Sequence, residues 1–256
     1  MVVKGRRVVN VTSPPTSRTP QRWVYGVNAV ARRLAVQPNT VREVRLLAAR
    51  SARLRAVAAR AAQCGIPVRE ADDAGLRQVT GSRQHQGAAA LTDGFRYSDV
   101  EPFISAGTGP LLIVDQIQDP QNLGALIRTA AATGMAAVVL PRDGAVGVTP
   151  AAEKAAAGAV NDIPVCRVVN LSRLLRRLRE RGIWTLALVP RGGENLLTVE
   201  IPRPIALVVG GEAGLRPLVE RSCDLRASIP VCGPVESLNA SVAGAIGMYE
   251  IVRRQR

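Results

Sequence analysis

The chain has 256 residues, of which 47% are hydrophobic and only 3% are aromatic, so the core of one or two domains must be built mainly from alanine, valine and leucine. No apolar run is long enough to span a membrane, no apolar segment follows the basic N-terminus as in a secretory signal, and the four cysteines lack Cys-x-x-Cys spacing. We therefore expect a cytoplasmic protein with no membrane contact, no disulfide framework and no metal site. A single histidine, His85, cannot form a metal site alone.

The net charge of +14 is distributed unevenly along the chain. Residues 1–94 contain 16 basic and 5 acidic residues, whereas residues 95–256 contain 18 and 15. All basic residues except Lys4 and Lys154 are arginine, whose planar guanidinium suits phosphate groups and base stacking. A GC-rich genome would explain arginine in place of lysine, but not the asymmetry. The asymmetry predicts that the first part of the chain holds a polyanion and the second part carries out chemistry on it.

Residues 1–21 have little to bury and are predicted to form a disordered basic arm. Residues 22–94 are predicted to form a small α/β domain. Its first helix begins within residues 25–30 and runs to about residue 35, and the remaining elements are strands at 41–47, 67–70 and 88–91 and helices at 52–63 and 72–79. Residues 95–108, which include Pro102 and Gly107, are predicted to be a linker that lets the flanking domains move.

From residue 109 to residue 256 strands and helices alternate, which favours an α/β fold with a parallel sheet covered by helices on both faces. The predicted strands are 111–115, 136–140, 165–169, 183–189, 205–209 and 226–229. The predicted helices are 122–133, 150–157, 171–181, 215–222 and 238–254.

Three loops that follow strands of this part are rich in small and polar residues. They carry Asn-x-Gly-x-x-x-Arg at residues 122–128, Gly-x-Glu-x-Gly at residues 210–214, and Ile-Pro followed by Ser-Leu-Asn-x-Ser within residues 229–241. Ser237, Asn239 and Ser241 crowd one helix start, although a cap needs only one of them, and the free N–H groups and positive dipole end there favour a ligand. These loops are therefore the candidate functional site.

The other two loops add glycine and charged residues to this candidate site. Gly210 and Gly211 allow the backbone to approach a ligand closely. A bare carboxylate at Glu212 is costly without a partner. Arg128 stands between apolar residues, which disfavours a position facing solvent.

In this order the three motifs resemble those of the SpoU/TrmH (SPOUT) family of RNA ribose 2′-O-methyltransferases, over roughly the last 150 residues. The resemblance implies S-adenosylmethionine as the cofactor, a homodimer with active sites near the subunit interface, and a C-terminal trefoil knot in which the end of the chain threads a loop. Tyr25-Gly26 and His85-Gln86-Gly87 are similar to parts of an L30e/L7Ae-like substrate-binding domain. His85 is either an RNA contact of that domain or a structural residue at a turn.

The resemblance also implies roles for the candidate residues. Arg128 would act as a base or as a cation that stabilises the ribose alkoxide, and a guanidinium pKa above about 12 favours the cation. Asn122 would position Arg128 or the ribose, and Glu212 would pair with Arg128 or with a loop amide. Ser237 and Asn239 would complete the catalytic site. Gly210, Gly211, Ile229 and Leu238 would bind the cofactor. The second motif is one residue shorter than the Gly-x-Glu-x-x-Gly of close ribosomal-RNA members, which is expected to shift Glu212 slightly.

The two-domain layout is most similar to the members that methylate a guanosine of 23S rRNA, so RNA is the expected partner and DNA is not. Members that methylate tRNA and antibiotic-resistance enzymes that methylate rRNA remain alternatives within the class. A non-catalytic RNA-binding protein is the alternative outside it. The chain lacks both the Gly-x-Gly-x-x-Gly spacing of a dinucleotide site after a first strand and the Gly-Lys-Ser/Thr of a Walker loop.

Overall fold

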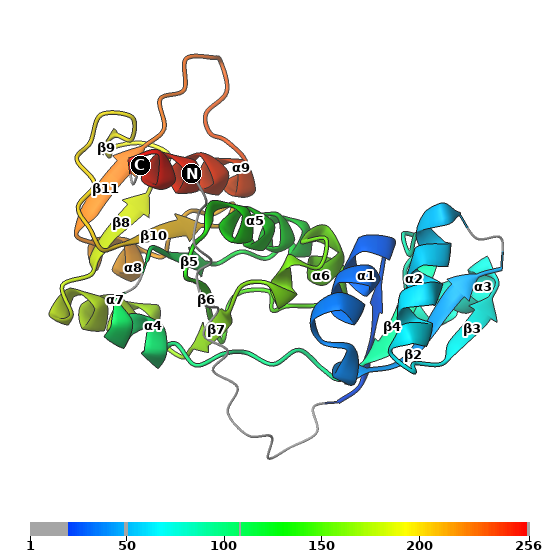
Figure 1. Cartoon of the computed structure of the whole chain (residues 1–256). Coiled ribbons are helices and arrows are strands. Elements are labelled where there is room, and N and C mark those ends of the chain that lie inside the picture. Colours follow the sequence, from blue (N-terminus) through cyan, green and yellow to red (C-terminus); the bar gives the residue numbers. More distant parts are fainter. Residues whose placement is uncertain (1–19, 49–50, 108, 255–256) are drawn as a thin grey trace, which may run out of the picture.

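The structure is a computed structural model that describes residues 20–48, 51–107 and 109–254. The predicted basic arm, residues 1–21, lies outside this part of the chain except for its last two residues. Two sheets are formed within the described residues, one on each side of the segment around residue 95 (Figure 1). No helix in these ranges has both the length and the apolar character needed to cross a bilayer.

The first sheet has the order β1-β4-β2-β3, with the β2/β3 pair parallel and the other pairs antiparallel. Its unit contains β1 (Arg22–Tyr25), α1 (Val27–Val36), the short helix η1 (Pro38–Thr40), β2 (Val41–Leu47), α2 (Ala52–Gln63), β3 (Val68–Ala71), α3 (Asp73–Thr80) and β4 (Ala88–Thr92). Helices α1 and α2 bury Leu34 and Val57 against one core cluster, and α3 buries Leu76 against Tyr25 in another.

Strand β1 is absent from the elements predicted from the sequence. It is only four residues long, so it is too short to show the alternation of a strand. Gly26, at a φ of 96°, then turns the chain directly into α1. The strand and the helix therefore merge into one apolar run in the sequence.

The second sheet has seven strands in the order β7-β6-β5-β10-β8-β11-β9, and every neighbouring pair is parallel. The predicted α/β fold with a parallel sheet is confirmed. The elements are α4 (Glu101–Ala106), β5 (Leu111–Asp115), α5 (Pro120–Thr133), β6 (Ala137–Pro141), α6 (Pro150–Ala155), η2 (Ala159–Asn161), β7 (Val165–Val168), α7 (Leu171–Glu180), β8 (Trp184–Leu188), β9 (Glu194–Asn195), β10 (Ile205–Gly210), α8 (Pro217–Arg221), β11 (Leu225–Ser228) and α9 (Ala240–Arg253).

Successive side chains of the central strands feed two different cores. In β5, Leu112 and Val114 pack on the side of α5 and α9, whereas Leu111 and Ile113 pack on the side of α4, α7 and α8. Helices α5 and α9 lie side by side on one face of the sheet (Figure 1). Burial on both faces explains why these strands are continuously apolar in the sequence.

The segment predicted as a linker, residues 95–108, contains the helix α4 and well-packed side chains. Ile104 is 2% exposed, and Phe95 and Tyr97 pack against the core of the second unit. Pro102 lies in the first turn of α4, where its missing N–H does no harm, and Gly107 ends the helix in a left-handed conformation. The two residues that indicated a linker therefore mark the ends of a helix.

Candidate active site

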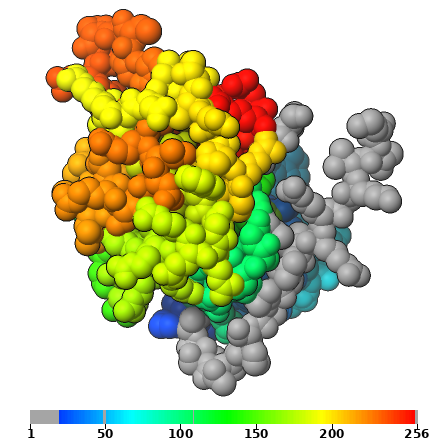
Figure 2. Space-filling model, turned by 90° about the vertical axis from the view of Figure 1, so that its left-hand side faces the viewer, coloured from blue at the N-terminus to red at the C-terminus, as the bar shows by residue number. Residues whose placement is uncertain are grey.

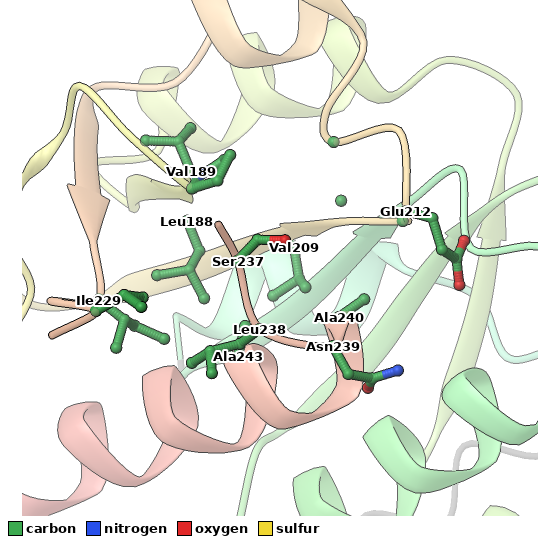
Figure 3. Close-up of a pocket in the computed structure, with 15 residues that line it drawn as sticks. Leu188, Val189, Val209, Glu212, Ile229, Ser237, Leu238, Asn239, Ala240 and Ala243 are labelled. Carbon is green, nitrogen blue, oxygen red and sulfur yellow. The ribbon is translucent and has the colours of Figure 1, made fainter. Parts of the chain in front are cut away.

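A cavity of about 330 Å³ opens at the carboxyl ends of β8, β10 and β11 and at the start of α9 (Figure 3). Ligands of parallel α/β sheets bind at this edge, because the loops there leave the sheet in different directions. The lining residues come from β8, β10, α9 and three loops: Leu188, Val189, Pro190, Val209, Gly210, Gly211, Glu212, Gly214, Ile229, Val231, Ser237, Leu238, Asn239, Ala240 and Ala243.

The shortened second motif forms a tight turn beside the cavity. Gly214 N–H donates to the carbonyl of Gly211 at 2.9 Å, and Gly211 N–H donates to the carbonyl of Asp115 at 2.9 Å. A Cβ on Gly210 would lie 2.3 Å from the carbonyl carbon of Gly214, and a Cβ on Gly211 would lie 2.2 Å from the carbonyl oxygen of Gln116. Only glycine fits at either position, so the turn packs directly on the end of β5.

A chain of hydrogen bonds joins the three motifs. Asn122 Nδ2 donates to Glu212 Oε1 at 2.7 Å, and Asn239 Nδ2 donates to Asn122 Oδ1 at 3.0 Å. Asn239 Oδ1 in turn accepts hydrogen bonds from the backbone N–H of Ser241 at 2.8 Å and from its hydroxyl at 2.6 Å, which caps α9. Glu212 is thus paired with Asn122 of α5, whereas the sequence predicted Arg128 or a loop amide as its partner.

Arg128 is placed differently from the other candidates. It lies on α5, its side chain is exposed, and it is not among the residues that line the cavity. Its neighbours Ile127 and Ala130 face the core, so Arg128 points away from the core on the same helix. The apolar sequence around Arg128 belongs to the buried side of α5 and does not bury the arginine, contrary to the expectation from its context.

The remaining predicted site residues lie together at the cavity. Gly210, Gly211, Glu212, Ile229, Ser237, Leu238 and Asn239 all line it. Asn122 reaches the same place through its hydrogen bonds to Glu212 and Asn239.

Several lining residues were not predicted from the sequence. Leu188, Val189 and Pro190 form one wall of the cavity at the end of β8. The strand itself was predicted, but its position next to β10 depends on the order of strands in the sheet. The sequence signal for this wall is an apolar strand that ends in proline. That signal does not tell which strands lie next to β8 in the sheet.

The third-motif loop, residues 230–239, is exposed along its whole length. The chain that precedes α9 projects from the body of the molecule in the orange part of Figure 2. Val231 and Leu238 of this loop line the cavity together with residues at the end of β8. Arg191 Nη2 lies 3.9 Å from Glu236 Oε1, so the loops on the two sides of the cavity carry opposite charges toward each other.

A buried carboxylate holds the segment that follows the second motif. The Asp115 carboxylate, 0% exposed at the end of β5, accepts hydrogen bonds from the backbone N–H and the Nε of Arg216, each at 2.9 Å. Sequence reasoning missed both residues, because the acid ends a predicted strand and the arginine opens a predicted helix 101 positions later.

The histidine is structural. His85 is 3% exposed, its Nδ1 accepts the N–H of Gly87 at 3.1 Å, and its Nε2 lies 3.1 Å from Asp73 Oδ1. This geometry supports the structural alternative over an RNA contact. Across the residues that the structure describes, no three His, Cys, Asp or Glu side chains gather as a metal site would require.

Comparison with known proteins matches both parts of the chain to family models. A model described as the SpoU rRNA Methylase family matches residues 110–249. A model described as RNA 2′-O ribose methyltransferase substrate binding matches residues 23–98.

Two curated relatives align with this chain over nearly the whole length of both proteins. The 23S rRNA (guanosine-2′-O-)-methyltransferase RlmB of Xylella fastidiosa is 39% identical over 241 residues, which cover 91% of this chain and 97% of the relative. The protein of the same description from Xanthomonas axonopodis pv. citri is 40% identical with the same coverage.

Solved structures have the same fold. A putative RNA methyltransferase of the TrmH family from Porphyromonas gingivalis is 27% identical and has a TM-score of 0.70, with 91% of this chain and 90% of that chain covered. The SpoU methyltransferase AviRb from Streptomyces viridochromogenes in complex with AdoMet is 22% identical with a TM-score of 0.75, with 92% of this chain and 90% of that chain covered.

Proposed function

This chain belongs to the SpoU rRNA methylase family, and from that premise we propose that it methylates the ribose 2′-hydroxyl of one guanosine in 23S rRNA. It is an RNA ribose 2′-O-methyltransferase that uses S-adenosylmethionine. The observation that carries the proposal is the hydrogen-bonded chain of Glu212, Asn122 and Asn239, which brings three sequence motifs to the rim of one cavity. The guanosine of 23S rRNA is the substrate printed for relatives that align with 97% of their own length.

The cavity fits S-adenosylmethionine by its composition. Leu188, Ile229 and Leu238 offer apolar contacts for the adenine, and Gly210 and Gly211 line the cavity beside them without side chains. When bound, the cofactor supplies an activated methyl group. The residues of this chain then have to hold the cofactor, exclude water and orient the ribose hydroxyl.

Asn122 and Asn239 act by orientation, because their amides are already fixed by hydrogen bonds on both sides. Ser237 also lines the cavity, with its hydroxyl near Val209 (Figure 3). Arg128 is the proposed cation that stabilises the developing alkoxide. Its exposed guanidinium makes no ion pair with any described residue and is available to bound RNA.

A methyl-transfer assay tests this function. The protein would be incubated with labelled S-adenosylmethionine and with protein-free 23S rRNA, 16S rRNA or tRNA, and the label would be mapped. We expect label at a single 2′-hydroxyl of 23S rRNA. Label in tRNA alone would show that the proposed substrate is wrong, while the proposed reaction would stand. No label together with no cofactor binding would favour a non-catalytic RNA-binding protein.

The Arg128→Ala variant tests the proposed cation. Loss of one group that stabilises transition-state charge lowers kcat by about 100- to 1,000-fold, and we expect an effect of this size with unchanged cofactor affinity. Arg173→Ala is the matched control, because Arg173 is an exposed arginine on α7 in the other layer of the domain. Near-normal turnover of Arg128→Ala would remove Arg128 from the mechanism.

We also propose a homodimer that pairs through α9. Val242 is 48% exposed and Tyr249 is 59% exposed on this helix, and Ile246 lies between them on the same side. A Tyr249→Arg variant would place a charge in this contact, and light scattering should then report a monomer where the native chain gives a dimer. A native monomer at micromolar concentration would contradict the proposal.

Family membership carries three further proposals. They are the trefoil knot formed by the segment that leads from β11 to α9, an L30e/L7Ae-like classification of the first unit, and a cytoplasmic location. The knot proposal is supported by the sheet order, in which β10 returns between β5 and β8. It is also supported by α9, which returns to pack on α5.

A further inference from the structure

The two units of the chain meet in an interface that contains a buried carboxylate. Helix α1 of the first unit faces α6 of the second (Figure 1). Glu153 of α6 has a side chain that is 1% exposed, and its carboxylate accepts hydrogen bonds from Arg22 of β1 and Arg33 of α1. The distance from Arg33 Nη2 to Glu153 Oε1 is 2.5 Å.

Glu153 depends on the first unit for its charge balance. Its described ion pairs are with Arg22 and Arg33, which belong to the other unit and lie more than 100 positions away in the sequence. Arg33 is almost as buried, with 3% of its side chain exposed, and its second Nη donates to Gln37 at 2.8 Å. Separation of the units would remove both ion-pair partners of Glu153 and the ion-pair partner of Arg33, so the contact favours one docked arrangement.

Further contacts surround this buried pair. Arg32 of α1 forms a bidentate pair with Asp162, and Lys154 Nζ donates to Gln84 Oε1 at 2.6 Å. At Gly158 a Cβ would lie 2.6 Å from the Cβ of Arg32, so the two backbones approach closely. The interface therefore has a buried, charged centre at Glu153 and a polar rim.

The segment that connects the units is held at the same place. The hydroxyl of Tyr97 accepts the N–H of Val148 at 2.9 Å, and the guanidinium of Arg167 lies 4.6 Å from the centre of the Tyr97 ring. Val148 also accepts a hydrogen bond from Arg22. The connection is thus anchored next to the buried pair.

We propose that Glu153 is a positioning residue that docks the RNA-binding unit on the catalytic unit in one orientation and thereby selects which nucleotide of the bound RNA reaches the cavity. This inference rests on the proposed function. A unit on a free tether would allow many nucleotides near its binding site to reach the cavity. A docked unit fixes the separation between the RNA grip and the cavity, so that one nucleotide at the matching distance is presented.

The test compares Glu153→Gln and Glu153→Ala with Asp162→Asn. The glutamine keeps the size of the side chain and removes its charge, which protects the test against a failure of the alanine variant to fold. Asp162→Asn removes one partner of the exposed Arg32–Asp162 pair and is the matched control, because exposed pairs contribute little. The three readouts are hydrogen exchange of α1 and α6, the affinity for S-adenosylmethionine, and a map of methylated positions on 23S rRNA.

We expect faster exchange in α1 and α6, unchanged cofactor affinity, a loss of roughly tenfold or more in kcat/KM for RNA, and label at additional nucleotides. Asp162→Asn should match the native chain in all three readouts. Unchanged exchange in the Glu153 variants would show that Glu153 does not hold the units together. Faster exchange with native single-site methylation would show that docking does not select the nucleotide. If the native chain labels no RNA, the proposed function and this selection both fail, and the exchange data still decide whether Glu153 docks the units.

Discussion

The hydrogen bond between Asn122 and Glu212 can be tested by reversing its polarity. Asn122→Asp keeps the shape of the side chain and the oxygen that accepts from Asn239, but it replaces the donor amide with an oxygen that faces the Glu212 carboxylate. Asn122 is 8% exposed, so the new carboxylate cannot easily turn into water. We expect the second- and third-motif loops to lose their common anchor, and cofactor binding to weaken.

The size of this effect follows from the geometry. A hydrogen bond to a charged group contributes about 1.5–3 kcal/mol, and two unit charges about 4 Å apart repel by about 4 kcal/mol at an effective dielectric constant of about 20. Glu212 is exposed and can turn away, which relieves most of the repulsion. A net cost of about 2 kcal/mol then remains, which corresponds to roughly 30-fold weaker binding of S-adenosylmethionine.

The assay is calorimetric titration of S-adenosylmethionine into the native chain, Asn122→Asp, Glu212→Gln and the double variant. In the double variant the amide introduced at position 212 can donate to the carboxylate introduced at position 122, so the bond reforms in the opposite direction and most of the affinity should return. Gln121→Glu is the control, because it adds the same charge to the same turn of α5 at an exposed position. Native affinity in Asn122→Asp, or no recovery in the double variant, would refute the reasoning.

Two further predictions concern α9. Glu250 accepts hydrogen bonds from Arg253 and Arg254, which lower the pKa of its carboxyl to about 2. The ionised carboxylate therefore stabilises the fold at a pH above its ordinary pKa of about 4.5, and this stabilisation is lost as the pH falls toward 2. Chemical unfolding should therefore show the native chain about 1–2 kcal/mol more stable than Glu250→Gln at pH 7, a modest value because the solvent around Arg253 screens the pair. The two proteins should be equally stable near pH 2, and equal stability at pH 7 would contradict the prediction. Gly244→Ala places a Cβ 2.4 Å from Cδ2 of Leu126 on α5 and should destabilise the fold by about 1–3 kcal/mol in the same unfolding experiment, whereas an unchanged midpoint would mean that the two helices separate easily.

Local sequence signals were sufficient for most regular elements of the second unit, with α4 and β9 as the exceptions. Strand β5 matches its predicted range, and α5 begins two residues before its predicted start because Pro120 occupies the first turn after the cap at Asp119. Strand β9 was missed because two residues show no period. Alternation of strands and helices predicts a parallel sheet, but it does not predict the order of the strands, because each pairing joins residues that are distant in the sequence.

In the candidate site, too, local sequence predicts the individual residues but does not predict which distant residues meet. The hydrogen-bond partners of Asn122 lie 90 and 117 residues away, and nothing in a single sequence states that these residues meet. Their convergence was predicted by family resemblance alone, and it agrees with the rule that loops at the carboxyl ends of parallel strands share one edge. The wall at Leu188 and Val189 needed the strand order in addition, and no motif marks it.

Arg128 and Glu153 show that burial separates two kinds of charged residue that look alike in the sequence. Both stand in alanine-rich helical segments, and both contexts suggest a buried side chain. Arg128 is exposed, contrary to its context, whereas Glu153 is buried because arginines from the other unit neutralise it. An apolar sequence context therefore indicates only that the helix is packed. Which side chain on that helix meets solvent is decided by the surface packed against it, and for Glu153 that surface is the first unit of the chain.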